Sequence, residues 1–255
     1  MLEENILEFF KSKNIIYFKT LDSTQTYASD LVSKNKPKQK TAILTYNQLK
    51  GKGQLGATWY SEQGNNISMS LIISPEFLQI EDQFLLSQMT ALAVRKIVQR
   101  HVQSKVMIKW PNDILIGKRK VAGILINNTL QGSTITTSII GIGINVNQVK
   151  FPSDLPFATS MLLESEIKFD LNILVSELLD AFDEYYEWLK NGKYELLRSK
   201  YLEYLYGFQL PLEFILPEGT QICGKILDVL NNGRLKVRTK EGDRTFDIRE
   251  LKFML

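Results

Sequence analysis

The chain has 255 residues, of which 44% are hydrophobic and 23% are charged, a balance typical of a folded globular protein. Its 31 basic and 28 acidic residues give a net charge of +3, too small an excess to indicate a nucleic-acid-binding protein from total charge. One cysteine and one histidine exclude an intramolecular disulfide and a zinc site built from Cys and His. We interpret His101, near the end of a long predicted helix, as a surface histidine or one with its hydrogen bonds satisfied, rather than as a triad member.

The first residues do not have the basic start and apolar core of a signal peptide. The longest apolar runs are also shorter than the roughly 20 residues that a membrane helix needs. We therefore expect a cytoplasmic protein that does not enter a membrane.

Residues 1–206 contain patterns of short strands and of amphipathic helices. Asp22 and Ser23 are good N-caps for a helix that runs through Leu31. Further helices are expected at 5–13, 81–102, 171–190 and 194–205, and strands at 15–21, 41–47, 67–73, 106–109, 114–116, 121–128 and 134–146. Runs of strands beside grouped helices, without regular βαβ alternation, predict an α+β fold with a mixed sheet.

From residue 207 the helical period stops. Strands are expected at 210–216, 221–230, 234–238 and 244–248, and Asn232-Gly233 is a strong hairpin signal. We predict a separate small β-barrel at 207–255 beside the larger domain at 1–206.

A glycine-rich loop at 48–58 contains Gly51, Gly53 and Gly56, which satisfy the G-x-G-x-x-G pattern. The residues that follow are poor helix formers, so the loop is not the strand-to-helix turn of a dinucleotide site. Two interpretations stay open at this point. The glycines form either a mobile surface turn or a cradle of backbone N–H groups for an anion, with added charge from Lys50 and Lys52.

A second cluster begins with Lys-Trp-Pro-Asn-Asp at 109–113. The hairpin that follows is compact, so Asp113 and Lys120 are expected near one another. Lys120 precedes the small residues Ala122 and Gly123, and a buried lysine is costly unless it meets an anion. The alternative is a polar hairpin tip with an incidental Trp-Pro turn.

Five motifs in this order resemble those of the biotin protein ligases. They lie at 22–24, 48–59, 109–113, 120–125 and 141–145, and the resemblance extends from about residue 15 to the C-terminus. It implies a catalytic domain like that of class II synthetases, with a largely antiparallel sheet. It also implies that biotin reacts with ATP and Mg²⁺ to form biotinyl-AMP, which then biotinylates a lysine of a biotin carboxyl carrier protein.

The resemblance also assigns roles to residues. Lys120, with Lys52 as second choice, would stabilise the charge that develops during adenylation, and Asp113 would orient or deprotonate the incoming lysine. Trp59 would stack on adenine, unless it is an ordinary core aromatic, and Asp113 could instead be only a turn cap. The residues expected to bind biotin or the adenylate are Ser23, Thr24, Gln25, Gln48, Gly51, Gly53, Gln54, Trp59, Asn112, Gly123, Gly143 and Asn145.

Two departures from the family pattern matter. Many members carry arginine at the positions of Lys52 and Gln54, so we hypothesise that this loop releases the adenylate more readily. Only about twenty residues precede Asp22, so we expect a ligase without a DNA-binding domain and without DNA as a partner. The resemblance also allows a homodimer. The competing functions are a lipoate or octanoate ligase and a non-catalytic biotin-binding protein.

Overall fold

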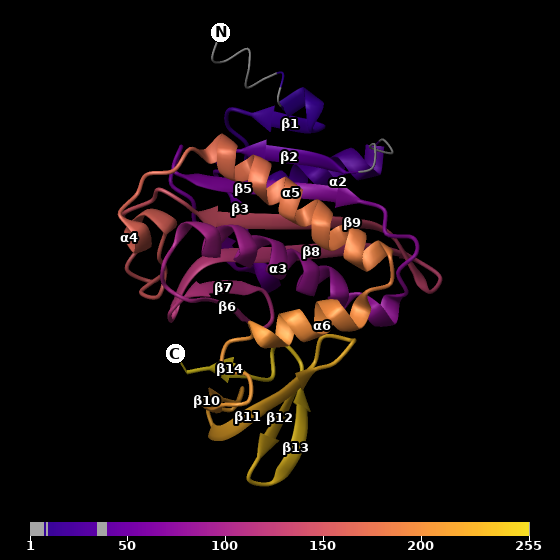
Figure 1. The fold of residues 1–255 in the computed structure, drawn as a ribbon, viewed down its shortest axis with the longest axis vertical. Helices are drawn as coiled ribbons and strands as arrows, with labels where there is room; N and C mark the ends of the chain where they lie inside the picture. The colour runs from indigo at the N-terminus through magenta and orange to yellow at the C-terminus, as the bar shows by residue number, and fades with distance from the viewer. Residues whose placement is uncertain (1–7, 9, 35–39, 255) are drawn as a thin grey trace.

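The computed structural model describes residues 8, 10–34 and 40–254. Two sheets dominate it, a seven-stranded one and a five-stranded one below it in Figure 1. The larger sheet has the order β1-β2-β5-β9-β8-β7-β6, and only the β1–β2 pair is parallel. Its strands are β1 (Ile15–Phe18), β2 (Thr41–Thr45), β5 (Asn66–Ile73), β6 (Val106–Lys109), β7 (Asp113–Ile116), β8 (Arg119–Gln131) and β9 (Thr134–Asn145). The predicted α+β class and the largely antiparallel sheet are confirmed.

Helices cover both faces of this sheet. One face packs against α3 (Phe84–His101) and α5 (Leu171–Lys190), which cross in front of it in Figure 1. The other face packs against α2 (Thr24–Lys34), for which Ser23 is the N-cap. The remaining helices are α4 (Met161–Ser165) and α6 (Tyr194–Glu203).

Alternation along β5 decides which face carries polar groups. Ile67, Met69 and Leu71 belong to the main core on the α3 side. Ser68 and Ser70, which alternate with them, therefore point to the α2 side, because successive strand residues face opposite ways. The α2 side of the sheet is thus lined by small polar residues at its centre.

The β6 edge of the sheet is not open. Ile108 donates its N–H to Tyr204 O at 2.8 Å and accepts from Tyr206 N at 2.7 Å. The segment between α6 and the small sheet therefore pairs with β6 by backbone hydrogen bonds.

The five-stranded antiparallel sheet has the order β13-β12-β11-β10-β14. Gly233, with φ of +87°, forms the predicted hairpin turn between the second and third of its strands in chain order. The strands are β10 (Pro211–Ile215), β11 (Gln221–Val229), β12 (Leu235–Thr239), β13 (Gly242–Phe246) and β14 (Lys252–Phe253). Buried side chains of both sheets belong to one continuous core, and the division at residue 207 stays a prediction.

Several predicted boundaries need correction. The helix expected at 81–102 begins at Phe84, after a short 3-10 turn at Ile80–Asp82, and the strand expected at 15–21 ends at Phe18. Helix α4 and strand β14 were not predicted, because five-residue and two-residue elements show no periodicity. Of the helix expected at 5–13, residues 5–7 and 9 lie outside the described residues, whereas residues 8 and 10–12 are helical. No helix in the described part of the chain is long and apolar enough to cross a membrane.

Candidate active site

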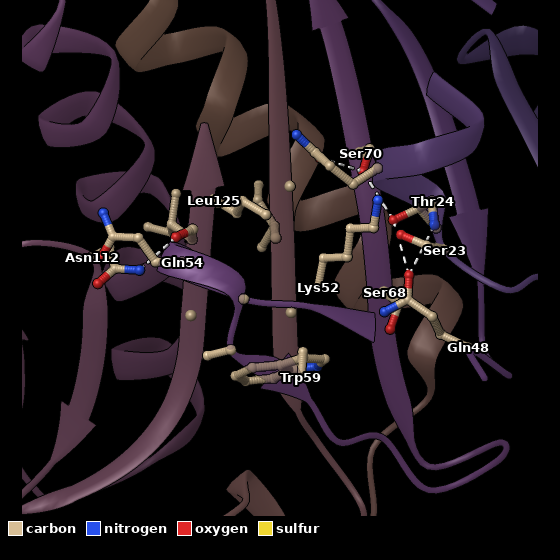
Figure 2. Close-up of a pocket in the computed structure, with 18 of the residues that line it drawn as sticks. Ser23, Thr24, Gln48, Lys52, Gln54, Trp59, Ser68, Ser70, Asn112 and Leu125 are labelled. Atoms are coloured by element: carbon tan, nitrogen blue, oxygen red, sulfur yellow. Dashed lines mark hydrogen bonds between the residues drawn. The ribbon is translucent and has the colours of Figure 1, made fainter. Parts of the chain in front are cut away.

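A pocket of about 230 Å³ opens on the α2 side of the large sheet (Figure 2). It is walled by the start of α2, the glycine-rich loop, β5, β7, β8 and β9. All the predicted site residues line it except Gly51 and Asn145. The lining also includes residues that were not predicted, namely Ala57, Thr58, Ser68, Met69, Ser70, Ile124, Leu125, Gly141 and Ile142.

One end of the pocket is a network of uncharged polar side chains. Gln48 Oε1 accepts from the backbone N–H of Thr24 at 2.9 Å and from its hydroxyl at 3.2 Å. Ser70 Oγ lies 2.9 Å from Thr24 Oγ1 and 3.0 Å from Gln25 Oε1, and the Gln25 amide donates to Ile139 O at 3.1 Å. All four side chains are buried. Their fixed donors and acceptors suit a ligand group that is polar but uncharged.

Ser68 adds an unsatisfied group to this end. It is 2% exposed, and its hydroxyl has no hydrogen-bond partner among the described residues. Ser68 and Ser70 occupy alternate positions between apolar residues of β5, and that alternation is the sequence signal for both residues.

Glycines form the floor of the pocket beneath Trp59. A Cβ built on Gly143 would lie 2.4 Å from Trp59 Cε2, and one on Gly123 would lie 3.0 Å from Trp59 Cζ3. Only glycine lets the indole approach the sheet this closely. Trp59 is partly exposed and its buried Nε1 has no partner among the described residues, so it is not an ordinary core aromatic.

The glycine-rich loop folds as a two-stranded ribbon, β3 (Gly51–Lys52) and β4 (Thr58–Trp59), around a 3-10 turn at Gln54–Gly56. No α-helix follows it, which agrees with the rejection of a dinucleotide site. Gly51 pairs with Trp59 in the ribbon and lies outside the lining, where a Cβ would meet Trp59 O at 2.3 Å. Figure 2 shows the Lys52 side chain extending towards Thr24, with Gln54 at the other end of the pocket towards Asn112.

The other end of the pocket is charged. Asp113 Oδ1 lies 2.5 Å from Lys120 Nζ, and Asp113 Oδ2 lies 3.2 Å from Lys109 Nζ. The Asp113 side chain is 15% exposed. Burial by itself raises the pKa of Asp113, but the two lysines outweigh it and hold the pKa below its usual range. Asp113 is therefore a carboxylate, and the three side chains together carry one net positive charge.

A β-bulge brings Lys120 into this cluster. Ile114 pairs with Ala122 but Leu115 pairs with Lys120, so Val121 is an extra residue in β8. In a regular strand, Lys120 and Gly123 would face opposite sides because they are three residues apart. The bulge places the Lys120 amine 3.3 Å from the Cβ position of Gly123, inside the pocket.

Asn112 and Asn145 hold neighbouring backbone. The Asn112 amide donates to Ile124 O at 2.7 Å, and the Asn145 amide donates to Thr159 O at 3.0 Å. Asn145 is 4% exposed and its Oδ1 has no partner among the described residues, although it lies outside the lining of the pocket.

Trp110 and His101 lie away from the pocket. The buried Trp110 donates its indole N–H to Gly233 O at 2.8 Å, so it joins the 109–113 motif to the small sheet. His101 contacts Glu177 at 2.6 Å at the end of α3, as expected of a histidine outside the site.

Comparison with known proteins identifies the family of the chain. Residues 17–145 match the model of the biotin/lipoate A/B protein ligase family. The chain is 32% identical over 233 residues to the bifunctional ligase/repressor BirA of Bacillus spizizenii, and the match covers 90% of this chain and 71% of that protein. BirA of Bacillus subtilis is 31% identical with the same coverage. The chain belongs to the biotin protein ligase family.

Solved structures of family members agree. The biotin protein ligase of Aquifex aeolicus in complex with biotin and ATP has a TM-score of 0.79 and 25% identity, and the match covers 95% of this chain and 99% of that one. The biotin protein ligase of Leishmania major in complex with biotinyl-5-AMP has a TM-score of 0.64 at 24% identity, with 92% and 98% coverage. The matches cover both sheets of the present chain, so both sheets belong to the fold shared with these ligases.

Proposed function

We propose that this protein attaches biotin to a lysine of a carrier protein in two steps, with ATP as the energy source. The observation that carries the proposal is a single pocket that joins an uncharged polar end to a Lys120–Asp113 cluster, in a member of the biotin protein ligase family. The natural acceptor we propose is the biotin carboxyl carrier protein of an acetyl-CoA carboxylase, the enzyme named for the related ligase of Paracoccus denitrificans.

The polar end would bind the ureido ring of biotin. That ring carries N–H donors and a carbonyl acceptor without net charge, and each needs a partner once it is buried. Ser23, Thr24 and Gln48 carry such donors and acceptors, and the Ser68 hydroxyl, which has no partner among the described residues, offers one more.

In the first step, an oxygen of the biotin carboxylate attacks the α-phosphorus of ATP. The bond from that phosphorus to the bridging oxygen breaks, and pyrophosphate leaves with the electron pair. Two anionic groups must approach, so fixed positive charge has to lie where they meet. Lys120 is the amine at the charged end of the pocket, and Lys52 extends from the loop into the same pocket towards Thr24.

The nucleotide would lie against the glycine-rich loop, whose Gly53 and Gln54 line the pocket. Trp59 would stack on the adenine ring, and Asn145 would accept a hydrogen bond from the exocyclic amine of adenine. The second role suits the Asn145 amide because its N–H already bonds Thr159 and its oxygen is free.

Magnesium would accompany the nucleotide rather than occupy a protein cage. The described residues contain no group of three or more His, Cys, Asp and Glu side chains able to hold a metal ion. Mg²⁺ usually keeps several waters and binds through substrate phosphates with few protein ligands. It would therefore need no cluster of protein carboxylates in the pocket.

In the second step, the amine nitrogen of the carrier lysine attacks the acyl carbon of biotinyl-AMP. The C–O bond to the phosphate breaks, AMP leaves with the electron pair, and the nitrogen loses a proton as the amide forms. Asp113 would attract the incoming ammonium group and orient it, because it is a carboxylate at the charged end of the pocket.

The test is biotin-dependent exchange of radiolabelled pyrophosphate into ATP, repeated with lipoate and followed by transfer to a biotin carboxyl carrier domain. We expect biotin to support the exchange and lipoate not to support it. Exchange that occurs with lipoate but not with biotin would overturn the proposal. Lys120→Ala should abolish exchange, whereas Asp113→Ala should retain exchange and slow transfer. Lys118→Ala is the matched control, because Lys118 is exposed at the tip of the same hairpin.

A further inference from the structure

Asp113 has a second lysine partner that lies outside the pocket. Lys120 contacts one carboxylate oxygen and lines the pocket, whereas Lys109 contacts the other oxygen and does not line it. The two amines are therefore placed differently with respect to a bound substrate. Only Lys120 is positioned to leave Asp113 for an anion in the pocket.

Lys109 is fixed by its surroundings. It pairs with Asp113 in the β6–β7 register, and its side chain is only 18% exposed. Its amine lies 5.4 Å from the centre of the Phe253 ring in β14. Phe253 is buried and packs edge-to-face on Phe214, at 5.1 Å between ring centroids. A cation over an aromatic face is attracted to it, so the small sheet helps to hold this amine.

The proposed reaction makes this second partner necessary. When Lys120 moves to the carboxylate and phosphate of the reactants, Asp113 loses its shorter ion pair. A carboxylate that is 15% exposed and has no cation beside it takes up a proton, and a neutral acid does not attract an ammonium group. Among the described residues, Lys120 from β8 and Lys109 from β6 are the charged groups that act on Asp113.

We propose that Lys109 is a positioning residue that keeps Asp113 ionised and aimed at the incoming lysine while Lys120 holds the adenylate. This role rests on the proposed function. Lys109 does not touch substrate, and it acts on the second step through Asp113. The small sheet contributes to this positioning because its Phe253 ring contacts the Lys109 amine.

The experiment is single-turnover transfer from preformed biotinyl-AMP to the carrier domain of an acetyl-CoA carboxylase, measured across pH. Lys109→Met and Lys109→Gln should move the acidic limb of the rate profile upwards by about 1 to 3 pH units, the shift expected when a close cation is removed. At high pH the rate should return to that of the unmodified protein. Lys109→Arg should restore the profile, and Lys105→Met is the control, because Lys105 is exposed just before β6.

A second readout follows the carboxyl group itself. The ¹³C resonance of Asp113 is titrated with biotinol-5′-AMP bound, in the unmodified protein and in Lys109→Gln. The midpoint should rise in the variant. An unchanged midpoint, or a transfer rate that is lowered equally at every pH, would overturn the role of Lys109. Failure of the unmodified protein to form biotinyl-AMP would instead overturn the proposed function, so the two failures are distinguishable.

Discussion

Gly143→Ala tests how closely the glycine floor fits Trp59. The added Cβ would lie 2.4 Å from Trp59 Cε2 and 2.7 Å from Trp59 Nε1. The indole would therefore have to move by about 1 Å to reach the 3.4 Å of ordinary contact. Because Trp59 pairs with Gly51 in the loop ribbon, the displacement would pass to the loop.

Overpacking of this kind costs about 1 to 3 kcal/mol. If the same contact is needed when ligands bind, affinity for biotin and for the adenylate analogue should fall roughly 5- to 150-fold. Isothermal titration calorimetry with biotin and with biotinol-5′-AMP measures the loss, and tryptophan fluorescence reports the displaced indole. Gly224→Ala is the stability control, since its Cβ would meet Val237 in the small sheet instead.

A double-mutant cycle identifies the cause. In a Trp59→Ala background there is no indole to meet the new methyl group, so Gly143→Ala should have little further effect on affinity. An equal loss in both backgrounds would show that the methyl group obstructs the ligand directly, and the reasoning from Trp59 would be refuted.

Three further predictions concern stability and nucleotide binding. Trp110→Phe removes the N–H that bonds Gly233 O, so the free energy of unfolding in urea should fall by about 1 kcal/mol or more; an unchanged value would mean that this bond does not stabilise the joint between the sheets. Asn145→Ala should weaken ATP binding about 10-fold by calorimetry and leave biotin binding unchanged, and a loss for biotin alone would contradict the adenine contact. Ion pairs hold the pKa of Asp113 below 3.8, so its carboxylate stabilises the fold above that pH and loses this effect as the pH falls through the folded-state pKa. The difference in unfolding free energy between the unmodified protein and Asp113→Asn should therefore be constant above about pH 5 and shrink below 3.8, and a difference that grows on acidification would contradict the assignment.

Much of the pocket could be predicted because its motifs lie at the ends of neighbouring elements. Asp113 and Lys120 meet since the hairpin between them is short, and Ser23 and Thr24 meet Gln48 since α2 begins beside the loop. Helix α5 could be placed at its observed limits from apolar spacing alone.

Other features depend on tertiary structure. The bulge at Val121 reflects a register set by both neighbouring strands, and no local pattern marks it. Trp110 belongs to the 109–113 motif, yet it packs towards Gly233, because only the assembled small sheet supplies its acceptor. Gly51 lies in the loop ribbon and does not line the pocket. Its position depends on its pairing with Trp59, which the local sequence does not reveal.

The backbone pairing of Ile108 with Tyr204 and Tyr206 affects any attempt to divide the protein. A chain shortened to remove the small sheet and this segment would expose the free N–H and C=O groups of β6, which are a template for pairing with another molecule. Such a fragment should self-associate, and its loss of activity would then report aggregation as much as the missing sheet. A cut after Tyr206 keeps the two backbone bonds that cover β6, so it distinguishes the effect of losing the small sheet from the effect of aggregation.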